Sequence, residues 1–361
     1  MLEEVWTVQR VLDWCVGYLG RKGDEHPRLS AEWLLCNATG LSRVELYTHF
    51  DQPLSSDELA AMRAGVTRRG QGEPLQYVTG EMPFRHLVIR CEEGVLIPRP
   101  ETEVLVDAAL EGVDAALASG AAYDDVRVRR AGRVNAERAR GEAHVEELRA
   151  ALETSANEAG LLDERLVDEL LRANEQLAAA REEVPAGVRV LDLCTGSGCI
   201  ALSIASERPG THVVATDLAP RAVALATRNR DALDLADAVD LLECDLAADV
   251  PTELAGTFSV LVTNPPYIPT AQLEHDVPPE VRDHEPHLAL DGGTDGLDVF
   301  RRILEAAPAL LEPGGWLCVE LSEDNVHAAA ELCRAARVWS DVEVREDLTH
   351  RPRVLRAILA A

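Results

Sequence analysis

Residues 188–208 read VRVLDLCTGSGCIALSIASER, and this stretch decides the fold of the carboxyl-terminal half of the chain. VRVLDLC is a short apolar run typical of a buried strand, and IALSIASER is typical of a helix. The residues between them are Thr195, Gly196, Ser197 and Gly198, where glycines let the backbone turn tightly and approach a ligand closely. A strand, a glycine-rich turn and a helix in this order are typical of an α/β fold.

The same alternation continues toward the carboxyl terminus. Predicted strands are HVVATDL, AVDLLECDL, FSVLVTN and GWLCVELS, and the helix RAVALATRNRDAL follows the first of them. Strands that alternate with helices predict a doubly wound, mainly parallel, Rossmann-like α/β sheet. Ligands in such sheets bind at the carboxyl ends of the strands, so the residues that follow each strand are the candidates for a site.

The chain before this sheet divides into two segments. Residues 1–71 have apolar residues at helical spacing, and Ser55 with Glu58 has the pattern of a capping box. We expect a small helical bundle, which packs as an accessory domain or binds a substrate or partner. Residues 72–98 contain β-rich runs broken by Gly and Pro, which predicts a β-hairpin linker. The α/β domain then occupies residues 99–361.

Residues from about 111 to 187 interrupt that domain. They are rich in Ala, Glu and Arg, and they carry two apolar stripes at helical spacing, namely Val145, Leu148, Leu152, Ala156 and Ala159, then Leu162, Leu166, Leu170 and Leu177. The pattern predicts long helices packed as an antiparallel hairpin or a coiled-coil arm. Surface insertions cost little free energy, so the arm is either without chemistry or binds an unknown partner.

The charge and cysteine content restrict the class of protein. The 361 residues include 35 Lys and Arg against 63 Asp and Glu, a formal net charge of −28. Phosphate backbones are bound by clustered Lys and Arg, so we expect no direct nucleic-acid binding. The eight Cys form no CxxC pair and no zinc-like grouping with His, which favours reduced thiols in a cytoplasmic protein. We predict no signal peptide and no membrane span.

Acidic residues follow two of the predicted strands. Asp217 ends HVVATD, where an acidic side chain accepts hydrogen bonds from both ribose hydroxyls of an adenosine ligand; it is equally suited to cap the next helix. Asp245, in ECDL, would lie beside the adenine and accept from its exocyclic amine. The glycine turn lacks the full GxGxxG of a phosphate-binding turn. Together these residues indicate a nucleoside cofactor without a pyrophosphate.

The predicted strand FSVLV is followed by Asn264, Pro265, Pro266 and Tyr267. Two prolines cannot continue a central strand, because neither can donate to the ladder. The Asn264 side-chain oxygen and the Pro265 carbonyl can each accept from an NH₂ group, and Tyr267 offers a ring for stacking. We therefore assign catalysis and substrate binding to these four residues, as a clamp that orients a planar amide or aromatic amine toward an electrophile.

The segments VLDLCTGSG, ATD, ECD and TNPPYIP, in this order, resemble a class I S-adenosylmethionine-dependent N-methyltransferase. GEPLQYVTGEMPF, GVLIPRPETEVLV, EPHLALDGGTDGLDVFRRI and LEPGGWLCVEL narrow the resemblance to the protein-(glutamine-N5) methyltransferases that act on peptide chain release factors. This resemblance covers most of residues 1–110 and 188–361. It implies methyl transfer from S-adenosyl-L-methionine to the glutamine of the release factor's GGQ loop.

The resemblance also implies which residues bind each ligand. The cofactor would contact the glycine turn and the strand ends, namely Cys194, Thr195, Gly196, Ser197, Gly198, Asp217, Asp245, Leu246 and Asn264. The NPPY residues 264–267 would hold the glutamine side chain, and residues 98–103 would support the same site. Cys194 departs from the family pattern, which has Gly there, and a Cys is tolerated only if the backbone angle is unstrained. The insertion is a second departure, since α/β connections commonly have about 2–6 residues.

Other hypotheses stay open on the sequence. A ribosomal-protein glutamine is a rival substrate, and adenine N6 of nucleic acid is another, although the acidic charge counts against it. A further hypothesis is that the protein is not an enzyme but an inactive scaffold whose helical arm binds a partner. The run His284-Glu285-Pro286-His287 has too few ligands at a metal-like spacing, so we expect no metal.

Overall fold

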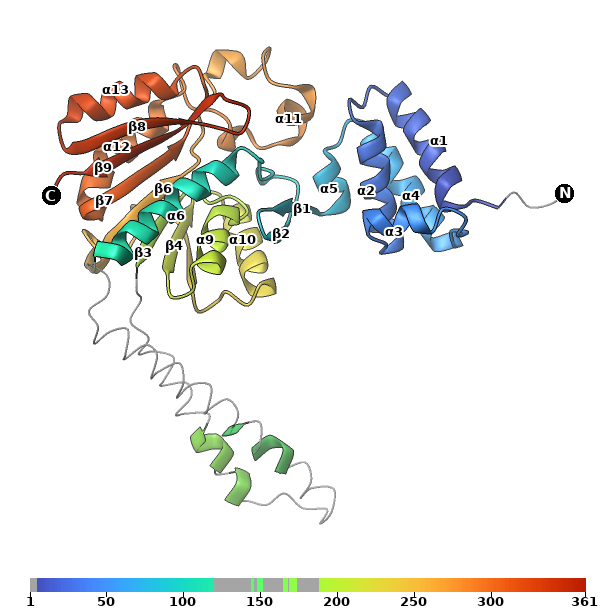
Figure 1. Ribbon diagram of the computed structural model, residues 1–361, viewed down its shortest axis with the longest axis horizontal. Coiled ribbons are helices and arrows are strands. Elements are labelled where there is room, and N and C mark those ends of the chain that lie inside the picture. Colours follow the sequence, from blue (N-terminus) through green and yellow to red (C-terminus); the bar gives the residue numbers. More distant parts are fainter. Residues whose placement is uncertain (1–4, 120–143, 146–147, 152–164, 168, 174–187) are drawn as a thin grey trace.

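The computed structural model describes residues 5–119, 144–145, 148–151, 165–167, 169–173 and 188–361. An amino-terminal helical unit lies beside a larger α/β unit, and a short hairpin connects them (Figure 1). No helix within the described residues is long and apolar enough to cross a bilayer.

A seven-stranded sheet forms the centre of the α/β unit, in the order β5-β4-β3-β6-β7-β9-β8. Its strands are β3 (Arg189–Leu193), β4 (His212–Asp217), β5 (Val239–Glu243), β6 (Phe258–Thr263), β7 (Leu311–Glu320), β8 (Trp339–Glu346) and β9 (Pro352–Leu359). Strands β3 to β7 pair in parallel. The chain runs outward from β3 to β5 and then returns to β6 on the other side of β3. This reversal opens a crevice at the carboxyl ends of β3 and β6.

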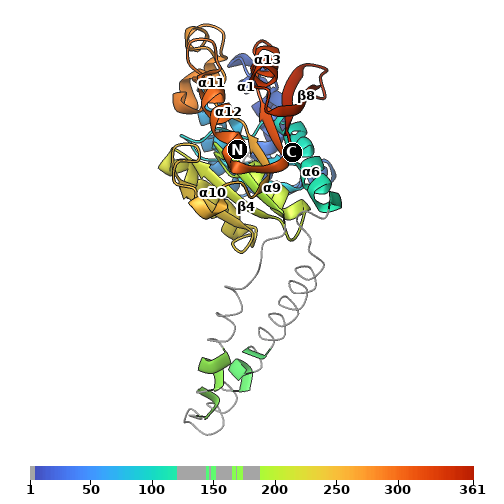
Figure 2. The ribbon, with the colours of Figure 1, turned by 90° about the vertical axis from the view of Figure 1, so that its left-hand side faces the viewer.

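Helices cover both faces of the sheet (Figures 1 and 2). On one face lie α6 (Thr102–Ser119), α9 (Cys199–Glu207) and α10 (Pro220–Ala232), and on the other α12 (Asp298–Leu310) and α13 (Val326–Ala336). Alternate strand residues supply the two cores, so that Val190 packs toward α9 while Leu191 packs toward α12. The predicted doubly wound, mainly parallel sheet is confirmed.

Strands β8 and β9 extend the sheet beyond the predicted strands. β9 lies between β7 and β8 and is antiparallel to both. Its residues Val354, Leu355 and Ala357 are fully buried. The last strand of the chain therefore completes the core next to β7, rather than forming a loose tail.

The predicted amino-terminal helical domain is confirmed, and it is longer than expected. Its helices are α1 (Val8–Arg21), α2 (Pro27–Thr39), α3 (Arg43–Thr48), α4 (Ser56–Arg69) and α5 (Leu75–Thr79). Ser55 and Glu58 form the predicted capping box of α4. The expectation of β structure from residue 72 is wrong for α5, whose Val78 joins the bundle core. Gly80, in a left-handed conformation, ends this short helix.

The predicted hairpin follows immediately, as β1 (Glu81–Phe84) and β2 (Leu87–Arg90). Asn229 of α10 holds it against the α/β unit. The Asn229 side-chain oxygen accepts from the Arg90 backbone N–H at 2.9 Å, and its amide nitrogen donates to the Ser197 carbonyl at 2.9 Å. One buried side chain thus fixes both the hairpin and the glycine turn.

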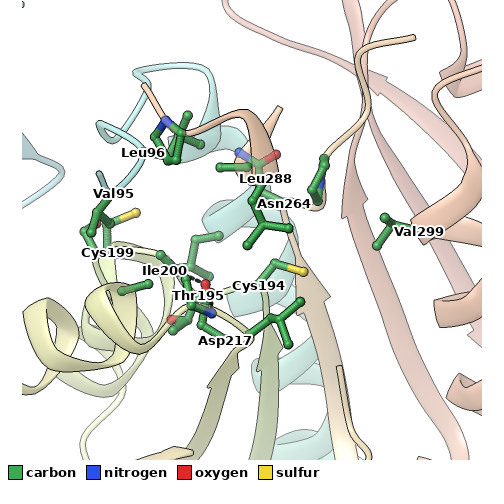
Figure 3. Close-up of a pocket in the computed structure, with 18 of the residues that line it drawn as sticks. Val95, Leu96, Cys194, Thr195, Cys199, Ile200, Asp217, Asn264, Leu288 and Val299 are labelled. Atoms are coloured by element: carbon green, nitrogen blue, oxygen red, sulfur yellow. Dashed lines mark hydrogen bonds between the residues drawn. The ribbon is translucent and has the colours of Figure 1, made fainter. Parts of the chain in front are cut away.

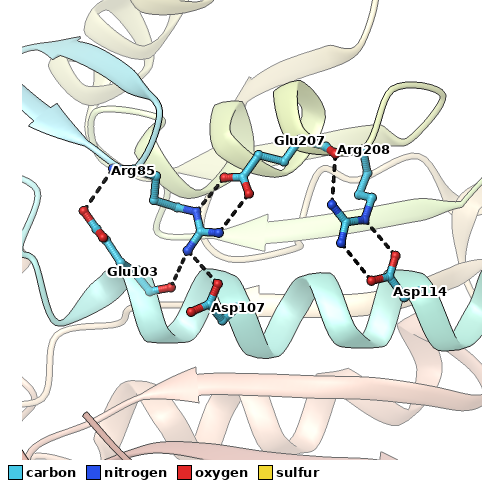
Figure 4. A network of polar contacts seen from close by, with 6 residues as sticks. All are labelled: Arg85, Glu103, Asp107, Asp114, Glu207 and Arg208. Carbon is cyan, nitrogen blue, oxygen red and sulfur yellow. Dashed lines mark hydrogen bonds and ion pairs between the residues drawn. The ribbon is translucent and has the colours of Figure 1, made fainter. Parts of the chain in front are cut away.

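Ion pairs hold α6 in place (Figure 4). Arg85, at the hairpin turn, binds Glu207 of α9 at 2.5 Å and Asp107 of α6 at 2.7 Å. Arg208, just after α9, binds Asp114 of α6 at 2.7 Å. These pairs connect the hairpin, α6 and α9 at several points along the helix.

The insertion does not begin at residue 111, because α6 continues to Ser119. Val113 is fully buried in the α/β core. A Cβ placed on Gly112 would lie 2.9 Å from Cγ2 of Val260, so α6 packs directly on β6 there. Residues 111–119 are therefore part of the sheet's cover, and the predicted boundary is wrong.

The described pieces of the insertion are helical and pack on one another. Buried Val145, Leu148 and Ala173 form a small cluster with Leu166 and Leu170. The two predicted stripes thus meet where they are described. Their other members, Leu152, Ala156, Ala159, Leu162 and Leu177, lie outside the described residues.

Candidate active site

A cavity of about 210 Å³ opens at the carboxyl ends of the parallel strands, where the strand order reverses. Figure 3 shows side chains converging on it from the glycine turn, from the segment before α6, and from the end of β6. Most of the predicted cofactor residues line it, namely Cys194, Thr195, Gly196, Ser197, Asp217, Asp245, Leu246 and Asn264. Ligands of doubly wound sheets bind at this position.

Asp192, near the end of β3, holds the glycine turn through hydrogen bonds. One of its carboxylate oxygens accepts from the Thr195 hydroxyl at 2.6 Å and from the Ala201 backbone N–H at 3.2 Å. Its other oxygen has no partner among the described residues, and burial raises the pKa of Asp192 to about 7. Sequence reasoning did not select Asp192, although a carboxylate inside the apolar run VRVLDL was a signal.

The backbone of the turn has left-handed residues at three places. Gly196 has φ 57° with open space above it, which leaves room for a ligand. Gly198 has φ 84°, and a Cβ there would lie 3.1 Å from Cβ of Ala226, so this glycine lets α9 and α10 approach. Gly198 does not line the cavity, unlike the other predicted residues of the turn. Cys194 has φ 59°, so the unstrained backbone that a Cys would need is not present.

Asp217 ends β4 and binds backbone on both sides. Its two oxygens accept from the N–H groups of Gly196 and Ala219, each at 2.9 Å. Burial raises the pKa of this carboxyl. Asp217 lines the cavity, so ribose binding stays a prediction. It is not the N-cap of α10, which is Ala219 and has no side-chain cap hydrogen bond, although Asp217 accepts from the Ala219 N–H.

Asp245 and Leu246 form the adjacent wall after β5. Arg302 of α12 donates to the Asp245 carboxylate at 2.7 Å. Leu246 has φ 53°, a conformation rare for a bulky residue, and its carbonyl accepts from the Thr216 hydroxyl at 2.7 Å. The chain after β5 is therefore held in one shape beside the cavity.

Asn264, directly after β6, lies between this cavity and a second one of about 260 Å³. Leu96, Arg99 and Ala289 are the other residues that line both. Pro266 lines the first cavity and Tyr267 the second, whereas Pro265 is buried and lines neither. Three of the four predicted clamp residues are thus divided between two adjoining cavities, and Pro265 is in neither.

The Asn264 side chain has a fixed orientation. Its amide nitrogen donates to Glu320 at 3.0 Å and to the Thr102 hydroxyl at 3.3 Å. No described residue donates to its side-chain oxygen, which is the atom that the clamp requires. Sequence reasoning missed Glu320, and it included Thr102 only within the supporting segment 98–103. Glu320 lies near the end of the predicted strand GWLCVELS, as Asp217 does in HVVATDL, and that shared position was the available signal.

The loop after Asn264 is braced by its neighbours. Asn325 donates to the Tyr267 carbonyl at 3.0 Å. The Ile268 backbone N–H donates to the Leu290 carbonyl at 2.9 Å, and the Gly292 N–H to the Ile268 carbonyl at 2.8 Å. The segment that leads into α12 therefore fixes the clamp.

The segment 98–103 reaches the site as predicted, with Pro98, Arg99 and Thr102 in the lining of the first cavity. Arg99 is held by Glu285, which is buried and binds it at 2.5 Å. Glu285 also accepts from the Ile97 N–H at 3.4 Å. The Glu285 carboxylate of the His284–His287 run is therefore already bound to Arg99. The described residues contain no group of three or more His, Cys, Asp and Glu side chains that could hold a metal ion.

Comparison with known proteins agrees with this architecture. A family model described as the PrmC N-terminal domain matches residues 10–80, which includes α5, and one described as the methyltransferase small domain matches residues 174–294. A glycine turn, acidic strand ends and an Asn-Pro-Pro-Tyr segment on a doubly wound sheet, together with the second match, make this protein a methyltransferase.

Curated relatives specify the family. A release factor glutamine methyltransferase of Geobacter sulfurreducens is 40% identical over 318 residues, covering 88% of this chain and 85% of that protein. Proteins of the same name from Chlorobaculum tepidum and Moorella thermoacetica are 33% and 34% identical and cover 96% and 97% of this chain, and 95% and 98% of their own lengths. The chain belongs to the release factor glutamine methyltransferase family.

Proposed function

We propose that this protein transfers a methyl group from S-adenosyl-L-methionine to the side-chain amide nitrogen of the glutamine in the GGQ loop of a peptide chain release factor. The observation that carries this proposal is the position of Asn264. It lies between two adjoining cavities with its amide nitrogen bound to Glu320. Its oxygen is therefore left to accept from a ligand's NH₂ group.

The first cavity suits the cofactor in shape and in chemistry. Asp217 offers a half-buried carboxylate for the ribose hydroxyls, and the open space above Gly196 admits close approach to the backbone. Asp245 and Leu246 would flank the adenine. Cys194, Thr195 and Ser197 would form the floor beneath the amino-acid end. These residues all line one continuous cavity.

The second cavity suits the glutamine side chain. Asn264 would accept one amide hydrogen through its side-chain oxygen. Pro265 lines neither cavity, so it would reach the other amide hydrogen only through its carbonyl, to which no described residue donates. Tyr267 would provide a wall against which the planar amide packs. Arg99 lines both cavities and is bound to Glu285, so it would fix the position of one cavity relative to the other.

S-adenosyl-L-methionine supplies an electrophilic methyl group when bound. An amide nitrogen is a poor nucleophile because its lone pair is delocalised. Hydrogen bonds from both of its hydrogens to Asn264 and Pro265 would aim that lone pair at the methyl carbon, so the chain contributes positioning and a preorganised polar environment. One amide hydrogen leaves as a proton once the new carbon–nitrogen bond has formed.

Two observations support a release factor as the partner, namely the net charge of the chain and the family to which it belongs. The net charge of −28 opposes a nucleic-acid substrate, and the named relatives act on release factors. We assign the amino-terminal helical domain to contact with the body of the release factor. A release-factor substrate also favours the cytoplasm, where translation terminates.

Mass spectrometry of a release factor after incubation with the protein and S-adenosyl-L-methionine tests the proposal. We expect one added methyl on the GGQ glutamine. Asn264→Ala should lower the rate about 10³-fold, as expected for loss of a preorganised polar contact, and leave cofactor affinity by calorimetry nearly unchanged. Undiminished turnover in this variant would contradict the clamp. Methylation of duplex DNA with none on the release factor would favour the adenine alternative.

A further inference from the structure

Glu320 is a buried carboxylate immediately behind the proposed clamp. It is the last residue of β7 and 2% exposed. One of its oxygens accepts from the Asn264 amide nitrogen at 3.0 Å. The other has no partner among the described residues. Glu320 lines neither cavity, so any role in the reaction is exerted through Asn264.

The chemistry of the two groups makes their pairing directional. An ionised carboxylate only accepts hydrogen bonds, whereas a carboxamide has an NH₂ end and an oxygen end. The ionised form of Glu320 therefore selects the NH₂ end of Asn264 and leaves its oxygen toward the cavities. A protonated Glu320 has an O–H to donate. Its other oxygen has no partner among the described residues, so the O–H is satisfied only on the oxygen that faces Asn264, where it pairs with the oxygen of a flipped Asn264.

The flipped arrangement is unsuited to the reaction. It would present an NH₂ group to the NH₂ group of the substrate, and two donors cannot hydrogen-bond to each other. Thr102, which also contacts the Asn264 nitrogen at 3.3 Å, does not oppose the flip, because its hydroxyl can donate as well as accept.

We propose that Glu320 is a positioning residue whose negative charge decides which end of Asn264 faces the acceptor cavity. This inference rests on the proposed function, since it concerns the orientation of the same clamp. It assigns an essential role to a residue that contacts neither the methyl donor nor the acceptor.

The surroundings of Glu320 place its loss of charge near neutral pH. Burial raises its pKa to about 7. Hydrogen bonds from Thr102 and Asn264 and the charge of Arg353 of β9 favour the charged form, and Glu101 opposes it. Tyr267 and Cys199 also face its charge. Because burial raises the pKa of Glu320, the fold favours its protonated form. This form predominates below about pH 7. The active orientation should therefore be lost as the pH falls through this value.

Single-turnover methylation of the release factor between pH 5.5 and 9 tests the proposal. Saturating cofactor is used because Asp192, beneath the glycine turn, also has a pKa raised to about 7. The wild-type rate should fall toward tenfold per pH unit below about pH 7. Glu320→Gln should be at least about twofold slower at pH 8, since a neutral amide cannot enforce one orientation of Asn264 and two equal orientations leave half of the molecules active. It should show no inflection near pH 7. Its cofactor affinity should stay within about twofold, because Glu320 does not line the cofactor cavity.

Thermal unfolding separates this role from a structural one. A residue kept for stability would lower the unfolding temperature when replaced, whereas Glu320→Gln removes a buried charge and should leave that temperature equal or higher at pH 8. Glu312→Gln is the matched control, because Glu312 is on the same strand and binds Ser259 at 2.6 Å, away from both cavities. It should keep the wild-type rate and pH profile.

A Glu320→Gln variant with the wild-type rate and inflection would overturn the inference. Should the variant not fold, the side-chain ¹⁵N resonance of Asn264 in the wild-type protein provides the test. It should shift with a midpoint near pH 7, and a resonance that does not titrate between pH 6 and 8 would equally overturn the inference. This signal needs no substrate, so it also distinguishes failure here from failure of the proposed function.

Discussion

Two residues of the cofactor cavity have backbone angles that L-amino acids rarely adopt. Cys194 has φ 59° and Leu246 has φ 53°. A left-handed conformation costs a residue with a Cβ about 1–2 kcal/mol. Cys194 directly follows β3, Leu246 lies in the loop just after β5, and both line the cavity. Backbone strain is thus concentrated where the chain has to bend around a ligand.

Replacement of Cys194 by Gly should therefore stabilise the protein. Glycine adopts the left-handed angle without a Cβ clash, so we expect the free energy of unfolding to rise by about 1 kcal/mol, measured by urea denaturation. Cys199→Gly is a matched control, because Cys199 begins α9 and glycine in a helix costs about 1 kcal/mol. A loss of stability in Cys194→Gly would show that its thiol packing outweighs the strain.

Single residues were predictable where a strand-end pattern carried the signal. Asn264 and Asp217 follow apolar runs directly, and both line the cavity as expected. Glu320 and Thr102 lie 56 and 162 positions from Asn264 in the sequence and reach it only through the sheet topology. The angle of Cys194 was equally inaccessible, because backbone conformation at one turn depends on how the neighbouring loops pack.

Secondary-structure elements were predictable in proportion to their burial. The parallel strands are apolar on both faces and stand out as runs, whereas β8 is only partly buried and mixes charged with apolar residues. α5 has only five residues, too few for a helical period to show. The end of α6 was misplaced because the Ala-rich helix leads directly into an Ala-rich insertion, so composition does not change at the boundary.

The length of α6 sets how the insertion can be removed. Replacing residues 120–187 by a short loop should leave the protein folded and able to bind the cofactor, since every residue of the sheet and its helices is retained. Replacing residues 112–186 should destabilise it, because burial of a side chain such as Val113 alone is worth about 1.5–3 kcal/mol. Thermal unfolding of the two deletions, with cofactor binding by calorimetry, makes the comparison.

The paired design gives each outcome a meaning. Equal stability of the two deletions would show that the last turns of α6 do not support the sheet. An insoluble product from the 120–187 deletion would show that the arm is structural, against the expectation that it is an appended element.

At the scale of the whole molecule, the helical domain contacts the α/β unit beside the second cavity. Arg69 of α4 is 11% exposed and binds both Asp24 of its own domain at 2.9 Å and Glu280 at 2.8 Å. Glu280 belongs to α11 (Pro279–His284), whose Val281 lines that cavity. The orientation of the helical domain is thereby linked to one wall of the proposed glutamine site.

This link matters most for a substrate large enough to touch both units. Glu280→Gln weakens the ion pair while keeping the side-chain shape, and a partly exposed pair is worth up to about 1 kcal/mol. We therefore expect the KM for an intact release factor to rise about two- to fivefold, and the KM for a short GGQ peptide to stay unchanged. Asp283→Asn, on the same helix but paired among the described residues only with its neighbour Arg282, should change neither value. An equal rise for peptide and protein would place the effect in the cavity wall itself, and would exclude a role for the ion pair in aligning the two domains.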